Sequence, residues 1–126
     1  FDVIVSLEVL SHVADQPAFM RHLASLLVPG GRLLMATQNR PVLERLNRIG
    51  APAPGQRRRW VDRRELRSLA EGAGFHVEQM FVVTPQSNHR VFRRVAWLAR
   101  IARATPLLER LGFGWTIMMD ARAPAA

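Results

Sequence analysis

Continuous apolar runs and apolar positions at helical spacing follow one another in the first 39 residues of the chain. The run within Asp2–Ser6 is β-branched and lacks polar alternation, which predicts a short parallel strand buried on both faces. Apolar residues in Phe19–Leu27 recur every three or four positions and predict one face of a helix. A second run, Leu33–Ala36, predicts another covered strand. Segment 1–39 therefore predicts a βαβ unit with adjacent parallel strands.

Local signals mark where this predicted helix begins and ends. Asp15 can accept hydrogen bonds from the first turn, and Pro17 fits that turn because it needs no backbone donor there. Pro29-Gly30-Gly31 stops the helix and turns the chain toward the second strand.

A second helix and strand are predicted over 62–84. Asp62 and Glu65 have the spacing of a capping box, and Gly74 closes the helix. Phe75–Thr84 follows as a strand. The helix is expected to bury Leu66, Leu69, Ala70 and Ala73, and the strand to carry Phe75, Val77, Phe81 and Val83 on one side.

The remaining segments are less regular. Pro41 can open a short helix that ends at Gly50, and the Gly/Ala/Pro stretch 50–55 predicts a mobile loop. Asn88–Arg103 has apolar positions at helical spacing with arginines on the other side, which predicts a lid or surface helix. Trp115–Ala121 predicts a final strand, and the tail Arg122–Ala126 is expected to be unstructured.

Composition narrows the class of protein without choosing a function. The chain has 126 residues, of which 48% are hydrophobic, so one globular domain is possible and a second full domain is not. It has no cysteine, which excludes a disulfide framework and a cysteine metal site. No apolar stretch approaches the roughly 18 residues of a membrane span. All 18 basic residues are arginine and the formal charge is +8, which allows contact with nucleic acid, anionic lipid or acidic ligands.

The chain closely resembles the middle of class I S-adenosylmethionine-dependent methyltransferases in the stretches FDVIVSLEVLSHV and LLVPGGRLLMATQN and in the helix between them. In that family these are the fourth and fifth strands. The stretch RRELRSLAEGAGFHVEQ is similar to the helix and sixth strand of the same enzymes. The nearest subgroup includes ubiquinone-biosynthesis O-methyltransferases, with a similar E-x-x-x-H stretch and P-G-G turn. The resemblance implies the C-terminal half of an α/β Rossmann-like sheet, with parallel strands, a final antiparallel strand and helices on both faces.

The resemblance also implies an organisation for the whole chain as one partial methyltransferase domain, 1–126. Its expected parts are the βαβ unit 1–39, a variable loop and short helix 40–61, a helix and strand 62–84, a lid-like basic helix 85–113, and a final strand and tail 114–126. The family's glycine-rich cofactor loop would lie upstream of Phe1, so the segment alone is expected to be incomplete for catalysis. The first strand would then keep an unpaired edge, which favours association with a second copy through that edge or through the basic helix.

The candidate site follows the first strand, since open α/β sheets bind ligands beyond the carboxyl ends of their strands. By resemblance, Ser6 and Leu7 border the cofactor S-adenosylmethionine, while Glu8 and His12 face the methyl acceptor. Methyl transfer from a sulfonium depends mainly on alignment and needs at most one base. A histidine side chain can accept a proton near neutral pH, so His12 could take that role. The alternative is a histidine that only holds the loop through hydrogen bonds.

Two tryptophans complete the list of candidate site residues, and the family also raises the question of a metal ion. Trp60 and Trp97 are expected to contact the substrate. The alternative for Trp60 is a solvated loop around Arg57-Arg58-Arg59, and the alternative for Trp97 is a helix packed on its own domain. Some quinone methyltransferases use acids in the strand loop, with the histidine, around a divalent cation. Ser11 precedes the histidine here, and Glu8 alone would hold a hard cation weakly, so no metal is expected.

The sequence therefore predicts a cytoplasmic S-adenosylmethionine-dependent methyltransferase acting on a small molecule. The alternative is a non-catalytic basic module that contacts an anionic membrane surface, through arginines and Trp97, or another protein chain. Nucleic acid is not expected as a partner, because the arginines are scattered and the few aromatic residues do not interleave on one strand.

Overall fold

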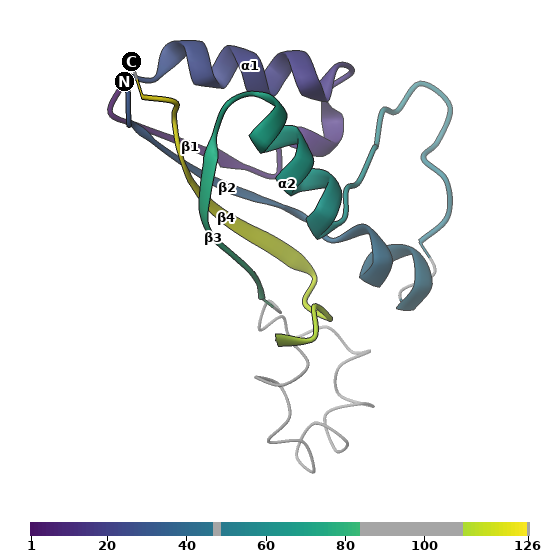
Figure 1. The fold of residues 1–126 in the computed structure, drawn as a ribbon. Coiled ribbons are helices and arrows are strands. Elements are labelled where there is room, and N and C mark those ends of the chain that lie inside the picture. The colour runs from purple at the N-terminus through teal and green to yellow at the C-terminus, as the bar shows by residue number, and fades with distance from the viewer. Residues whose placement is uncertain (47–48, 84–109, 126) are drawn as a thin grey trace.

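The computed structural model describes residues 1–46, 49–83 and 110–125 (Figure 1). Within these residues four strands form one sheet in the order β1-β2-β4-β3. The strands are β1 (Val3–Leu7), β2 (Arg32–Gln38), β3 (His76–Val83) and β4 (Thr116–Arg122). β1 and β2 are parallel, whereas β4 is antiparallel to both β2 and β3. The predicted parallel pair and the final antiparallel strand are confirmed.

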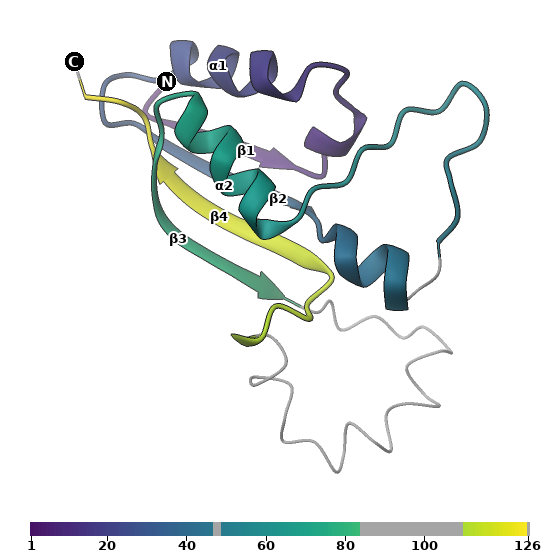
Figure 2. The ribbon, with the colours of Figure 1, turned by 45° about the vertical axis from the view of Figure 1, so that its right-hand side comes forward.

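Two α-helices, α1 (Gln16–Leu26) and α2 (Arg63–Gly72), lie on the same side of the sheet (Figures 1 and 2). Helices were expected on both faces, so this part of the expectation is not met by the described residues. The core lies between the two helices and the sheet. Its largest fully buried side chains include Met20, Leu33, Met35, Leu66 and Ile117.

The predicted helix caps are present. Asp15 Oδ1 accepts a hydrogen bond of 2.8 Å from the backbone N–H of Ala18 at the start of α1. At the start of α2, Asp62 Oδ1 accepts from Glu65 N at 2.9 Å, and Glu65 Oε2 accepts from Asp62 N at 2.8 Å. These bonds satisfy N–H groups that have no partner within the helix itself.

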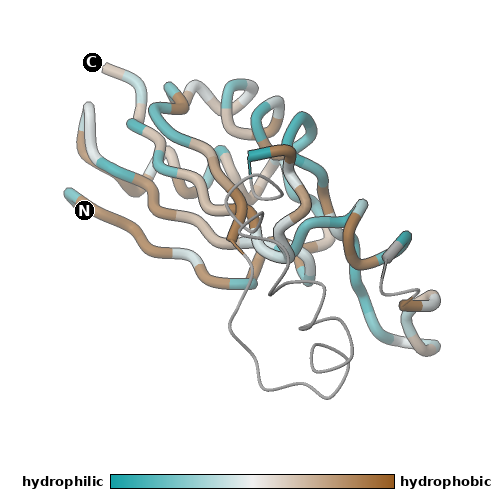
Figure 3. Tube along the Cα trace, turned by 90° about the horizontal axis from the view of Figure 1, so that it is seen from below, coloured by the Kyte–Doolittle hydropathy of each residue, from teal (hydrophilic) through white to brown (hydrophobic). Residues whose placement is uncertain are grey.

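The other face of the sheet is largely uncovered in the described part of the chain. Val3, Val5 and Leu7 are 49%, 59% and 62% exposed, so the prediction that β1 is buried on both faces is wrong. The strand register places Leu7, Ala36, Met118 and Phe81 in one apolar row across all four strands on this face. Figure 3 shows β1 as a mostly hydrophobic strand at the edge of the sheet. β1 pairs with β2 and with no second strand among the described residues.

β3 contains a β-bulge that changes which side chains reach the core. The pairing with β4 shifts between Val77 and Gln79. An extra residue on one strand turns every later side chain to the opposite face. Val82 is therefore buried and Phe81 is 49% exposed, so the expected one-sided set of Phe75, Val77, Phe81 and Val83 is wrong beyond the bulge.

The connections near both ends of the chain also differ from expectation. The helix expected from Pro41 to Gly50 is a π-helix, η2 (Val42–Leu46), and Ile49 and Gly50 are not helical. Ala123, placed in an unstructured tail by the sequence, is buried, and its N–H donates to Gly31 O at 2.7 Å.

Asn39 joins the end of β2 to the turn that precedes β4. Its side chain is 2% exposed, and Nδ2 donates to the carbonyl oxygens of Gly112 at 2.9 Å and Gly114 at 2.7 Å. Its backbone N–H donates to Trp115 O at 2.8 Å. Gly114 itself lies against β3, where an added Cβ would be 2.8 Å from a Val82 side-chain carbon. The entry of β4 into the sheet is therefore fixed by hydrogen bonds and close packing.

We expect Asn39→Ala to lower the free energy of unfolding by about 2–4 kcal/mol, because it removes two hydrogen bonds and leaves two carbonyl oxygens without their donor. Urea unfolding followed by circular dichroism measures this. Gln56→Ala in the exposed 50–60 loop is the matched control and should change stability by less than about 0.5 kcal/mol. Equal stability of the two variants would contradict the role given to Asn39.

Candidate functional site

Glu8, which follows β1 directly, has an unusual backbone conformation. Its φ is 58°, in the left-handed region that non-glycine residues rarely adopt. A hydrogen bond of 2.9 Å from Glu8 N to Ala36 O holds it against β2. Non-glycine residues in this region cost of order 1–3 kcal/mol and concentrate at functional sites. The strained position is thus at the carboxyl end of the first strand.

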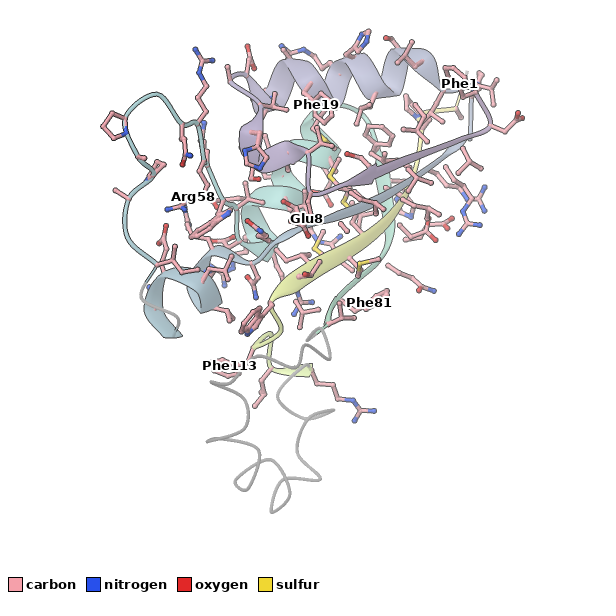
Figure 4. The ribbon with its side chains drawn as sticks, turned by 180° about the vertical axis from the view of Figure 1, so that it is seen from behind. Phe1, Glu8, Phe19, Arg58, Phe81 and Phe113 are labelled. Atoms are coloured by element: carbon pink, nitrogen blue, oxygen red, sulfur yellow. The ribbon has the colours of Figure 1, made fainter. Side chains whose placement is uncertain are left out.

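The Glu8 carboxyl group is partly withdrawn from solvent. Its Oε2 atom is buried and has no hydrogen-bond partner within the described part of the chain. Burial raises the pKa of this carboxyl above its usual value, and the nearby His12 opposes the rise. Glu8 therefore presents an acceptor oxygen, or a proton when neutral, that its own fold does not use (Figure 4).

His12 ends the short helix η1 (Leu10–His12), and its ring orientation is determined by one contact. Nδ1 lies 3.2 Å from the backbone carbonyl oxygen of Arg57. A carbonyl oxygen can only accept, so the ring donates through Nδ1–H and its lone pair is on Nε2 in the neutral form. The ring is exposed. His12 thus carries a basic nitrogen directed away from its hydrogen-bond partner.

Near its C-terminal end, the 50–60 loop is hydrogen-bonded to η1. Arg59 N donates to Ser11 O at 2.8 Å. Gln16, which is 1% exposed, donates from Nε2 to Leu10 O at 3.0 Å and to Arg59 O at 2.9 Å. The sequence analysis missed Gln16, since a polar residue in a first helical turn has no pattern that separates a buried bridge from a solvated side chain.

Four more buried polar atoms have no hydrogen-bond partner among the described residues. All belong to the ends of β1 and β2 or to the elements that follow β1. They are Ser6 Oγ, Ser11 Oγ, Gln16 Oε1 and Thr37 Oγ1. Buried polar atoms are normally paired, so such a group at one edge of the sheet is a property of binding sites more than of cores.

The structure brings together four of the six predicted site residues. Ser6, Leu7, Glu8 and His12 follow one another along β1 and its loop. Strand alternation separates the first two: the Ser6 side chain is buried on the helix-covered side, while Leu7 is on the open face. Their assignment to the cofactor stays a prediction.

Trp60 is buried at 7% exposure and packs within the fold. Its indole N–H donates to Gln38 Oε1, and the Arg58 guanidinium lies 4.3 Å from the ring centroid. A substrate contact by Trp60 stays a prediction. Trp97, and the helix predicted over Asn88–Arg103, lie outside the described residues.

The described residues contain neither a cluster of metal ligands nor a helix that could span a membrane. No group of three histidine, aspartate or glutamate side chains in residues 1–46, 49–83 and 110–125 is placed to hold a metal ion. Within the same part of the chain, no helix has the length and apolar character required to cross a membrane.

Comparisons with known proteins agree on one family. A profile described as a methyltransferase domain matches residues 1–80. The chain is 55% identical over 40 residues to a ubiquinone biosynthesis O-methyltransferase of Parvibaculum lavamentivorans, covering 32% of the chain and 16% of that relative. It is 32% identical over 99 residues to a protein of the same name from Aeromonas salmonicida, covering 70% of the chain and 42% of the relative.

The fold is also similar to a solved structure. An S-adenosylmethionine-dependent methyltransferase from Mesorhizobium loti superposes with a TM-score of 0.64 at 17% identity, covering 97% of this chain and 61% of that one. The chain thus spans less than half the length of these curated relatives and under two thirds of the solved structure.

We expect Glu8→Gln to raise stability at neutral pH, because the folded state holds this carboxyl in surroundings that disfavour its charge. A folded-state pKa above the unfolded value means that wild-type stability falls as pH rises from about 4.3, the ordinary glutamate pKa, through the raised folded value. The gain from the substitution should therefore vanish below about pH 4.

Urea unfolding from pH 3.5 to 8 measures this difference. Glu71→Gln, at an exposed position of α2, is the control and should show no comparable gain at neutral pH. A stability difference for Glu8→Gln that is the same at pH 3.5 and pH 8 would refute the buried-carboxylate interpretation.

Proposed function

We propose that this chain, which belongs to the class I S-adenosylmethionine-dependent methyltransferases, carries the acceptor-facing part of an enzyme that methylates an oxygen of a small molecule. The match over residues 1–80 and the order β1-β2-β4-β3 with an antiparallel β4 support the family. The O-methyltransferase names of relatives at partial coverage support an oxygen acceptor and a small substrate.

One observation carries the proposed chemistry, the contact between His12 Nδ1 and the Arg57 carbonyl oxygen. S-adenosylmethionine supplies its methyl group on a sulfonium sulfur, which leaves as a neutral thioether without help from an acid. The protein must align the acceptor and remove one proton from it. Nε2 of His12 takes that proton, and the Arg57 carbonyl oxygen keeps the ring in the required tautomer and stabilises the imidazolium that forms.

Glu8 fits the same site through an oxygen that has no hydrogen-bond partner among the described residues. A buried carboxylate oxygen without a partner is suited to a ligand group that donates a hydrogen bond or carries positive charge. Its left-handed backbone fixes the direction of the side chain. In the proposal Glu8 orients the acceptor hydroxyl, and Ser6 and Leu7 border the cofactor on the strand side.

The uncovered sheet face supports the idea that further polypeptide completes the enzyme. Val5, Leu7 and Phe81 are about half exposed or more, and β1 has one free edge among the described residues. A long apolar edge and face of this kind normally pair with other chain segments. We propose that a part carrying the glycine-rich cofactor loop covers them; a second copy of the chain is the alternative occupant.

The proposal also includes where the enzyme acts and which surface it contacts. The enzyme would act in the cytoplasm on a small-molecule methyl acceptor, with peripheral contact to anionic membrane. The formal charge of +8 supports such contact.

In the polypeptide that includes the cofactor loop, His12→Ala should lower kcat for methyl transfer by about 10²- to 10⁴-fold, the usual range for loss of a general base. Cofactor affinity, measured by calorimetry, should change little. His22→Ala, at an exposed position of α1, is the matched control and should leave kcat unchanged. A His12→Ala enzyme within twofold of wild type would remove His12 from the mechanism.

The 126-residue chain alone should show no saturable binding of S-adenosylhomocysteine, the demethylated product, in a calorimetric titration, because its sequence contains no glycine-rich cofactor loop. The longer polypeptide should bind with one-to-one stoichiometry in the same calorimeter. Saturable binding by the 126-residue chain would show that the segment suffices, and would contradict the proposal that a further part supplies the cofactor loop.

A further inference from the structure

A pocket whose lining includes no residue of the β1 loop opens where three segments meet after the carboxyl end of β2. Its volume is about 470 Å³. The first segment runs from Asn39 into η2 and carries Arg45. The second is the start of α2 with Arg63 and Arg64, and the third is the turn before β4 with Leu111 and Phe113. The Asn39 hydrogen bonds to Gly112 and Gly114 join the first and third segments, so the pocket has a rigid base.

The charges that line this pocket are unbalanced. Asp62 is the single acid in the lining among the described residues, and it is already engaged: Oδ2 pairs with Arg40 at 3.2 Å and Oδ1 accepts from Glu65 N. Arg45 and Arg64 make no ion pair with any described residue. Two guanidinium groups thus border the pocket without a counter-charge from the described part of the chain.

Arg63 is the third guanidinium and is held in place. It donates to Met80 O at 3.3 Å, and its Nη1 would be 3.7 Å from a Cβ added at Gly112. At the start of α2 the capping box already occupies the backbone N–H groups of Asp62 and Glu65, so these two donors are not available to an anion. The arginine side chains supply the positive charge at the pocket.

Apolar side chains complete the pocket. Leu111 is 63% exposed and Phe113 is 49% exposed, both at the pocket rather than in the core (Figure 4 labels Phe113). Large apolar side chains beside unpaired guanidinium groups match a ligand that has an apolar body and an acidic end.

We propose that this pocket binds an amphipathic organic anion, with its carboxylate or phosphate on Arg45 and Arg64 and its aromatic or aliphatic body on Phe113 and Leu111. Guanidinium groups bind both kinds of anion through paired N–H donors. The inference rests on the pocket alone and does not require the methyl-transfer proposal, since the binding is measured without the cofactor.

The test is a titration of the chain, and in parallel of the longer polypeptide, with three probes of matched ring size: phenylacetate, phenyl phosphate and neutral phenylacetamide. Two-dimensional NMR follows the shifts of Gly112 and Phe113. Saturable binding of either anion, at least tenfold tighter than phenylacetamide, is expected. The relative affinity of the two anions distinguishes a carboxylate ligand from a phosphate one.

The double variant Arg45→Gln/Arg64→Gln should weaken binding of the two anions by tenfold or more and leave the affinity for the neutral probe unchanged. Arg21→Gln/Arg67→Gln removes the same charge from exposed positions on α1 and α2 and is the control. Circular dichroism melts confirm that each variant is folded, and Arg45→Lys/Arg64→Lys should recover part of the affinity. Absence of saturable anion binding, equal binding of phenylacetamide, or equal losses in the two glutamine variants would overturn the proposal.

Discussion

The described fold depends on β4 pairing with two strands at once. β2 and β3 are not neighbours, so without β4 the β1-β2 pair has no hydrogen-bonded connection to β3. The pairing places Ile117, Met119 and Ala121 in the hydrophobic core, where each is at most 2% exposed. Asn39 and Gly114 fix the point at which β4 enters. Both candidate sites lie on elements whose positions follow from this arrangement.

Much of this fold was predictable from local patterns because those patterns act within a few residues. The Asp15 cap and the Asp62-Glu65 capping box are short-range hydrogen bonds, and both are present as predicted. The apolar runs of β1 and β2 were also sufficient to predict a parallel pair. What failed depended on distant partners. The β3 bulge arises from pairing with β4, and the exposure of Val3, Val5 and Leu7 depends on what lies over the sheet.

In the candidate site, too, the local features were predictable and the features that depend on distant segments were not. Position along the chain was sufficient to place Glu8 and His12 together, because both follow one strand within a short loop. The features that give the site its chemistry come from remote segments: the Arg57 carbonyl that orients His12, and the Ala36 carbonyl that holds Glu8 in a left-handed conformation. Gln16 and the arginine pocket were missed because neither has a local signature; their roles arise only when separate elements meet.

The hydrogen bond between His12 and Arg57 joins two properties that are usually treated separately. The orientation of the His12 ring and the position of the 50–60 loop are coupled, because this contact joins them. By linkage, a ligand of the exposed side chains of Arg57 or Arg59 that shifts the loop also changes the orientation of the His12 ring, and a ligand held by the ring changes binding at the loop by the same factor. The 50–60 loop and the proposed base, His12, are therefore energetically coupled.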